Sequence, residues 1–132
     1  MVVKPRFAPS PLRRRRGSLA HKAGLEAEKL AEDYIHHQGF TILTRRYRTA
    51  YGEIDLLAAN DDYLLAIEVK QRTTLSEARY AVSTRQSQRL LRAFQLVIET
   101  HPEWQRESTR FDVIIIDIAG EIDHIRDALR LT

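Results

Sequence analysis

The chain has 132 residues, of which 43% are hydrophobic and 30% charged, values typical of one folded domain and not of a disordered chain. No apolar run approaches the ~20 residues that span a bilayer, and no apolar segment follows the basic N-terminus as in a secretory signal. The absence of cysteine excludes disulfides and thiolate metal sites and fits a reducing compartment, the cytoplasm. A transit peptide is the alternative for the Arg-rich start, although serine is sparse there.

The net charge of +3 is unevenly distributed along the chain. Residues 1–22 hold seven of the 21 lysines and arginines and no acid, which leaves 14 cations against all 18 acids in the remainder. Residues 1–17 also hold three of the four prolines, and they are predicted to form a flexible basic arm before a folded domain at 18–132. The arm is equally compatible with contact to nucleic-acid phosphates and with a merely solvated tail.

The spacing of apolar residues predicts an α/β fold with the element order α-β-β-β-α-β-β. The first helix should run from about Leu19 to Gln38 and end at Gly39. The second should begin at Ser83, which has capping-box spacing to Gln86, and end near His101–Pro102. Strands are expected at Phe40–Arg48, Glu53–Ala58, Tyr63–Lys70, Phe111–Ile118 and Glu121–Arg126, with a loop at Thr73–Tyr80.

The first three strands are expected to form an antiparallel meander, because only short polar turns separate them. Side chains alternate along a strand, so Glu68 and Lys70 should share one face of the third strand while Val69 points to the other. On the second strand the same rule predicts two sets. Glu53, Asp55 and Leu57 form one, and Ile54, Leu56 and Ala58 form the other.

A turn centred between Asp61 and Asp62 would place Asp55 directly opposite Glu68, with Cβ atoms about 4.5–5.5 Å apart. Facing carboxylates repel each other, and a divalent cation between them reverses that interaction. Oxygen ligands of this kind suit Mg²⁺ or Mn²⁺. Lys70 would then stabilise an oxyanion or orient a water, which is the chemistry of metal-assisted phosphodiester hydrolysis. The alternative is a solvated strand face with a simple ion pair between Glu53 and Lys70.

Glu28 gives a second, partly independent indication of an acidic site. It lies at the border of the buried stripe of the first helix, where a carboxylate can lean toward the sheet. A solvated glutamate at the edge of the helix is the alternative, since acids are seldom buried without a partner.

The remaining polar residues divide into candidate phosphate contacts and structural residues. The five histidines have no metal-binding spacing and are expected at the surface, and Asp112 is expected to be structural. Six arginines are candidate contacts to a nucleic-acid backbone, with solvated strand ends as the equal alternative for the first four. They are Arg45, Arg46, Arg48, Arg72, Arg85 and Arg89.

Several blocks of the sequence resemble the bacterial YraN family over about residues 24–116. The most specific are Gly52-Glu-Ile-Asp-Leu56 and Glu68-Val-Lys-Gln-Arg72 at this separation. Further matches are Gly24-Leu-Glu-Ala-Glu28, Ala31, Tyr34, Gly39-Phe-Thr-Ile-Leu-Thr-Arg45-Arg-Tyr-Arg48 and Arg110-Phe-Asp-Val113. That family is similar to the PD-(D/E)xK nucleases, and among them to archaeal Holliday junction resolvases.

The resemblance implies a restriction-endonuclease-like three-layer core with a mixed sheet. It implies that Asp55, Glu68 and the Val69 carbonyl hold Mg²⁺ or Mn²⁺ and that Lys70 is the catalytic lysine. Glu28 would be the carboxylate of the first helix, reaching the metal directly or through water. Two positions depart from the family pattern, because Gln86 stands where relatives often have lysine and Arg46 where asparagine is usual.

Together these features predict a Mg²⁺-dependent endonuclease acting on DNA, with branched DNA as one candidate substrate. Symmetric cutting of two strands would favour a homodimer, although the sequence does not indicate a dimer surface. A non-catalytic nucleic-acid-binding or adaptor protein on the same fold is the main alternative, and Gln86 speaks mildly for it. An RNA- or ribosome-associated role rests on the basic arm alone.

Overall fold

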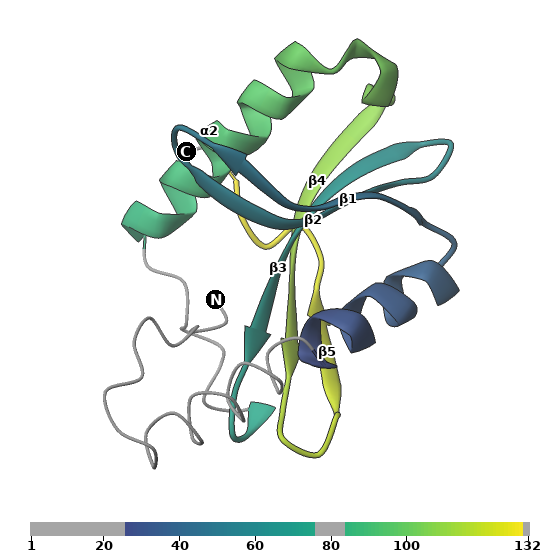
Figure 1. The fold of residues 1–132 in the computed structure, drawn as a ribbon, viewed down its shortest axis with the longest axis vertical. Coiled ribbons are helices and arrows are strands. Elements are labelled where there is room, and N and C mark those ends of the chain that lie inside the picture. Colours follow the sequence, from purple (N-terminus) through teal and green to yellow (C-terminus); the bar gives the residue numbers. More distant parts are fainter. Residues whose placement is uncertain (1–25, 76–83, 131–132) are drawn as a thin grey trace, which may run out of the picture.

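Five strands form one mixed sheet that lies between two helices (Figure 1). The computed structural model describes residues 26–75 and 84–130. The strands lie in the order β1-β2-β3-β4-β5, with β1 (Thr41–Thr49), β2 (Gly52–Ala59) and β3 (Tyr63–Gln71) as the predicted antiparallel meander. The predicted α/β class and element order are therefore confirmed. The predicted arm, the start of the first helix and the proposed cap at Ser83 lie outside the described residues.

Helix α2 (Thr84–Thr100) connects β3 to the parallel strand β4 (Ser108–Ile116), and η2 (Pro102–Trp104) follows the helix. Such a crossover is needed because parallel strands cannot be joined by a tight turn. The short strand β5 (Ile122–Ile125) then pairs antiparallel to β4 and completes the sheet. No described helix has the length and apolar character that a membrane crossing requires.

Each helix covers one face of the sheet with its own apolar cluster. On one face, α2 packs Leu90, Phe94 and Val97 against the sheet, where Leu64 and Ala66 of β3 are fully buried. On the other face, the N-terminal helix (described over 26–37) packs its alanines and Ile35 against a second set of strand residues. These include Leu56, Ala58, Leu65, Ile67, Val69, Ile114 and Ile116. Strand β3 is thus buried on both faces, and any polar side chain on it is enclosed.

The N-terminal helix ends at Gly39, as the sequence predicts, in a Schellman motif. Gly39 has a φ of +93°, its N–H donates to the His36 carbonyl at 3.0 Å, and the Phe40 N–H donates to the Ile35 carbonyl at 3.3 Å. The side chains of Ile35 and Phe40 then meet in the same apolar cluster. The motif sets the direction in which β1 leaves the helix.

Replacing Gly39 with alanine should lower the free energy of unfolding by about 1–2 kcal/mol, the usual cost of a left-handed backbone at a residue with a Cβ atom. Open space surrounds the position of an added Cβ, so this loss is conformational and not steric. Urea unfolding measures it. Asparagine tolerates this backbone better than alanine, so Gly39→Asn is the matched control and should lose clearly less. Equal losses in the two variants would contradict the conformational explanation.

Candidate functional site

The two predicted metal ligands lie where the pairing of β2 with β3 ends. The pairing follows the predicted register and its last recorded pair is Leu56 with Ile67, so Asp55 and Glu68 are the next residues on the two strands. The Asp55 Oδ2 atom accepts a hydrogen bond from the Val69 N–H at 2.8 Å. The Asp55 carboxylate therefore takes the place of a backbone acceptor, and this bond holds it beside the Glu68 segment.

The predicted alternation of side chains along β2 is wrong at one residue, Ile54. Ile54 was expected on the face of Leu56 and Ala58, but it packs in the cluster that contains Leu57 and α2. The strict period of two breaks at Asp55, where the strand leaves its partner and a side chain replaces the ladder contact. Ile54 thus turns toward α2 and adds to the apolar wall on that face.

Glu68 is the most unusual side chain of the site. It is only 1% exposed, and neither carboxylate oxygen has a hydrogen-bond partner within the described part of the chain. Burial first, and the neighbouring Asp55 second, raise the pKa of Glu68 strongly, with smaller effects from Glu53 and Glu28. A buried carboxyl without a partner is costly unless a cation or a proton balances it. The donor set and its electrostatics therefore fit a divalent cation.

Lys70 follows Glu68 on the same side of β3 and is also 1% exposed. Burial, with a smaller contribution from Arg72, lowers the pKa of its amine to about 8. The lysine is still charged in most molecules at neutral pH. It is a buried cation two residues from a buried acid, an arrangement that positions an ammonium group next to any ion or phosphate at the site.

Glu28 reaches this region from the N-terminal helix, but an arginine holds it. Arg46 donates to its Oε2 atom from Nε at 3.1 Å and from Nη2 at 2.7 Å. Within residues 26–75 and 84–130, no group of three or more His, Cys, Asp or Glu side chains is arranged to hold a metal ion. Asp55 and Glu68 are adjacent carboxylates, whereas metal ligation by Glu28 and by the Val69 carbonyl stays a prediction.

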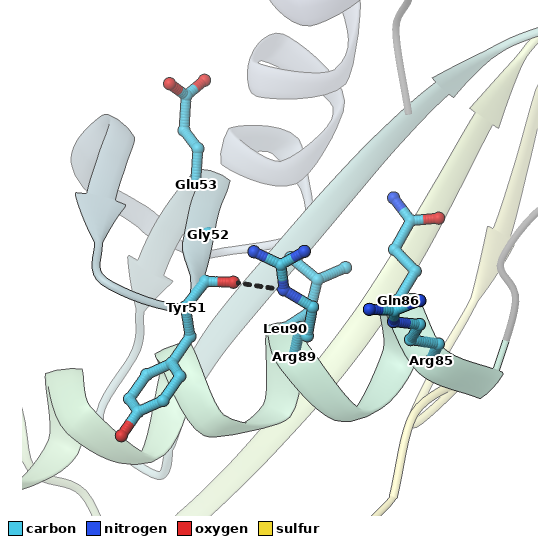
Figure 2. Close-up of a pocket in the computed structure, with 7 residues that line it drawn as sticks. All are labelled: Tyr51, Gly52, Glu53, Arg85, Gln86, Arg89 and Leu90. Carbon is cyan, nitrogen blue, oxygen red and sulfur yellow. Dashed lines mark hydrogen bonds between the residues drawn. The ribbon is translucent and has the colours of Figure 1, made fainter.

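A pocket of about 330 Å³ opens between the β1–β2 turn and the start of α2 (Figure 2). Its lining residues are Tyr51, Gly52, Glu53, Arg85, Gln86, Arg89 and Leu90. Arg89 donates from Nε to the Tyr51 carbonyl at 3.2 Å, and Gln86 and Arg89 extend from α2 toward the side to which Glu53 points. The pocket therefore holds two exposed cations beside Glu53, one of the acids that act on Glu68.

Of the other four predicted phosphate contacts, three form ion pairs with acids and one bonds a backbone carbonyl. Arg45 pairs with Glu32, Arg46 with Glu28, and Arg48 with Glu53 at 3.3 Å. Arg72 donates to the backbone carbonyl of Gln71 at 2.6 Å. Arg45 and Arg48 have exposed side chains and their ion pairs are of the weak surface kind. Arg85 and Arg89 are the two of the six that line the pocket.

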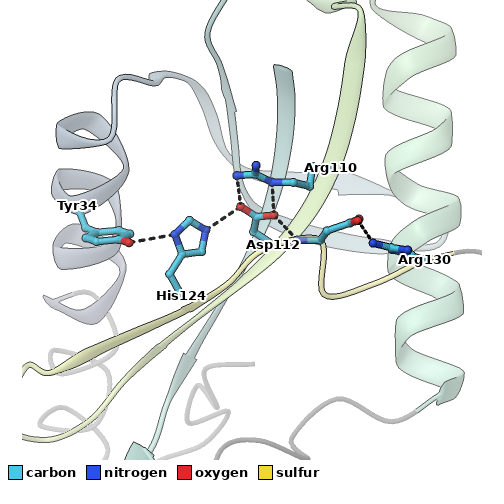
Figure 3. A network of polar contacts seen from close by, with 6 residues as sticks. Tyr34, Arg110, Asp112, His124 and Arg130 are labelled. Carbon is cyan, nitrogen blue, oxygen red and sulfur yellow. Dashed lines mark hydrogen bonds and ion pairs between the residues drawn. The ribbon is translucent and has the colours of Figure 1, made fainter. Parts of the chain in front are cut away.

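A second polar cluster, which the sequence did not predict, lies around Asp112 on β4 (Figure 3). This fully buried carboxylate accepts two hydrogen bonds from Arg110, at 2.8 and 2.9 Å, and one from the backbone N–H of Asp127. His124 Nε2 lies 2.7 Å from Asp112, and its Nδ1 lies 3.0 Å from the Tyr34 hydroxyl. We call these residues (Tyr34, Arg110, Asp112 and His124) the Asp112 network.

The prediction that the histidines lie at the surface is wrong for His124, whose side chain is 5% exposed. A neutral imidazole satisfies both neighbours when it donates to Asp112 and accepts from Tyr34. The structural role expected of Asp112 agrees with its position. The available signal was the Arg110-Phe-Asp112 spacing, which puts a cation and an acid on one face of a strand.

Comparison with known proteins establishes the family. A model of the uncharacterised protein family UPF0102 matches residues 27–116. The chain belongs to this family. UPF0102 is the YraN family, so the resemblance predicted from the sequence blocks is confirmed.

Curated UPF0102 relatives match nearly the whole chain. A UPF0102 protein of Granulibacter bethesdensis is 49% identical over 116 residues, which cover 88% of this chain and 73% of that protein. One from Azorhizobium caulinodans is 41% identical over 130 residues, or 98% of each chain. One from Rhodopseudomonas palustris is 41% identical over 116 residues, or 88% and 87% of the two chains. The matched region of UPF0102 contains the acidic site and most of the Asp112 network.

Proposed function

We propose that this UPF0102 protein is a metal-dependent endonuclease that hydrolyses phosphodiester bonds in DNA. The proposal rests chiefly on Glu68, a buried carboxylate whose two oxygens have no hydrogen-bond partner among the described residues. Asp55 lies beside it and is fixed by the Val69 N–H. A cation between the two acids would balance charges that otherwise raise the energy of the folded protein.

Asp55, Glu68 and the Val69 carbonyl would hold Mg²⁺ or Mn²⁺, with Glu28 as a further ligand directly or through water. When bound, such an ion polarises a phosphate oxygen and lowers the pKa of a coordinated water. Lys70 would hold its ammonium group against the attacking water or a non-bridging phosphate oxygen and offset the charge that develops there. The pKa of its amine, about 8, supports a charged lysine at neutral pH.

Substrate binding would use the cations around the pocket. Arg85 and Arg89 line it together with Glu53, so a phosphate held there would lie beside one of the acids that act on Glu68. Such contacts fix the position of the backbone and carry no sequence information. Branched DNA is the substrate we favour within this proposal. A homodimer would permit symmetric cutting, and a chain without cysteine suits the cytoplasm.

Cleavage assays on labelled DNA test the proposal. The purified protein should cut a four-way junction, a linear duplex or both with Mg²⁺ or Mn²⁺, and EDTA should abolish the reaction. Glu68→Ala and Lys70→Met should each lower the rate by about 10²–10³-fold or more, the usual cost of losing one group that stabilises the transition state. Gel-shift measurements should show that both variants still bind DNA.

Exposed residues of the same types give the matched controls. Glu107 and Lys29 are exposed and are neither proposed ligands nor lining residues of the pocket, so Glu107→Ala and Lys29→Met should cut at the wild-type rate. Binding of DNA without cleavage under any metal condition would reject the enzyme and support the adaptor on the same fold. Equal residual cleavage in all four variants would identify a contaminating nuclease.

A further inference from the structure

Arg46 adopts a backbone conformation that is unusual for a residue with a side chain. Its φ is +52°, and it lies in the middle of β1 between the pairs Arg45–Leu56 and Tyr47–Ile54. This register puts it across from Asp55 on β2. A left-handed residue inside a strand raises the energy of the fold, and such strain is common where a side chain must be aimed at a functional site.

The strained backbone directs the guanidinium onto Glu28. Two of its nitrogens bond the same carboxylate oxygen, and the Glu28 side chain is 15% exposed. Glu28 is one of the acids whose charge acts on Glu68. Arg46 therefore neutralises one of the acids that act on Glu68.

Arg45 shows that a second ion pair already links the same two elements without this strain. It pairs with Glu32, which lies one helical turn after Glu28, and its backbone pairs with Leu56 in the ladder that is regular from Thr44 onward. The Arg45 side chain is 60% exposed, against 35% for Arg46. Joining helix to strand does not require Arg46 to be strained, so its position needs another reason.

We propose that Arg46 is an internal competitor for the divalent cation: its guanidinium occupies Glu28 in the metal-free protein and weakens metal binding at Asp55 and Glu68. This inference rests on the proposed function. A cation that recruits Glu28 must first displace the guanidinium, and it also meets the repulsion of that charge. Metal affinity is then set by a residue that is not a ligand.

Isothermal titration of the full chain with Mn²⁺ tests the inference without any measurement of cleavage. Arg46→Asn removes the charge, and asparagine tolerates a left-handed backbone. This variant should bind Mn²⁺ about tenfold more tightly than the wild type, a typical coupling between two binding events. Arg45→Asn removes the neighbouring ion pair and should leave the affinity unchanged. Adding Glu28→Gln to Arg46→Asn should remove the gain.

The outcomes separate this inference from the proposed function. Binding that Glu68→Ala abolishes, with equal affinity in Arg46→Asn and wild type, overturns the competitor role and leaves the nuclease proposal intact. No Glu68-dependent binding in either protein overturns both. Mn²⁺ binding by Arg46→Asn and not by the wild type supports the inference and means that Arg46 blocks the metal completely. If Arg46→Asn does not fold, Arg46→Gly removes both charge and strain and must show the same gain.

Discussion

Replacing Glu68 with glutamine should raise the free energy of unfolding of the metal-free protein by about 1–3 kcal/mol at pH 8, because the buried wild-type carboxyl must be held either charged or protonated well above its ordinary pKa, whereas glutamine is neutral in both states. In the unfolded chain this carboxyl has a pKa near 4.5, and in the fold burial and Asp55 raise it strongly. A raised pKa means that stability is fully present below pH 4.5 and is lost as the pH rises toward the folded value. Glutamine has no charge to lose, so its advantage grows with pH.

Urea unfolding in EDTA at pH 5, 6.5 and 8 measures this effect. The difference between Glu68→Gln and wild type should be small at pH 5 and largest at pH 8, while Glu107→Gln, an exposed control, should match the wild type throughout. Adding Mn²⁺ should stabilise the wild type and leave Glu68→Gln unchanged, because ligands stabilise only a state that binds them. A glutamine variant less stable than the wild type at pH 8 would show that Glu68 already has a stabilising partner in the metal-free fold, which contradicts a carboxyl that only a cation balances.

This expected gain connects stability with the proposed chemistry. An acid that serves only structure would be bonded, as Asp112 is by Arg110. Glu68 instead lies in an apolar face with Asp55 beside it, so the fold is less stable than it could be. Functional sites commonly keep such local costs because the same groups bind a ligand well.

The register that brings the two acids together could be predicted from the sequence. The polar turn after β2 is fixed by Asn60, whose side chain accepts from the N–H groups of Asp62 and Tyr63, and strand alternation does the rest. The end of the ladder could not be predicted in this way. It depends on the Asp55 side chain bonding a backbone N–H, a choice between side-chain and backbone acceptors that periodicity does not encode.

The partners of buried charges were the least predictable part of the site. The helical pattern left open whether Glu28 leans toward the sheet or is solvated, and its bond to Arg46 depends on a positive φ at a residue that carries a side chain. His124 was expected at the surface because the histidines show no metal-binding spacing. Its two partners lie 12 and 90 residues away along the chain, and contacts of that range are set by packing and not by local pattern.

Asp112→Ala should lower the free energy of unfolding by about 3–5 kcal/mol, because removing one partner of a buried ion pair leaves the other charge unbalanced. Arg110 would keep a partly buried guanidinium without its two bonds, and His124 and the Asp127 N–H would each lose an acceptor. The network joins β4 and β5 to the N-terminal helix through Tyr34. Asp112→Ala should therefore lower the urea midpoint of the whole domain and not only loosen the C-terminal strand β5.

The fall of the free energy of unfolding at low pH should show that the charge of Asp112 causes this stabilisation. Burial alone would raise its pKa, but the hydrogen bonds from His124 and Arg110 outweigh burial and lower it below the ordinary 3.8. A lowered pKa gives stability that is present above pH 3.8 and is lost as the pH falls through the folded value, so Asp112→Asn should flatten this limb. Asp127→Asn, which removes an exposed ion pair with Arg130 and a weaker attraction to Arg110, should cost under about 1 kcal/mol. Equal losses of unfolding free energy in the Asp112 and Asp127 variants would mean that the Asp112 network stabilises the fold no more than a surface ion pair does.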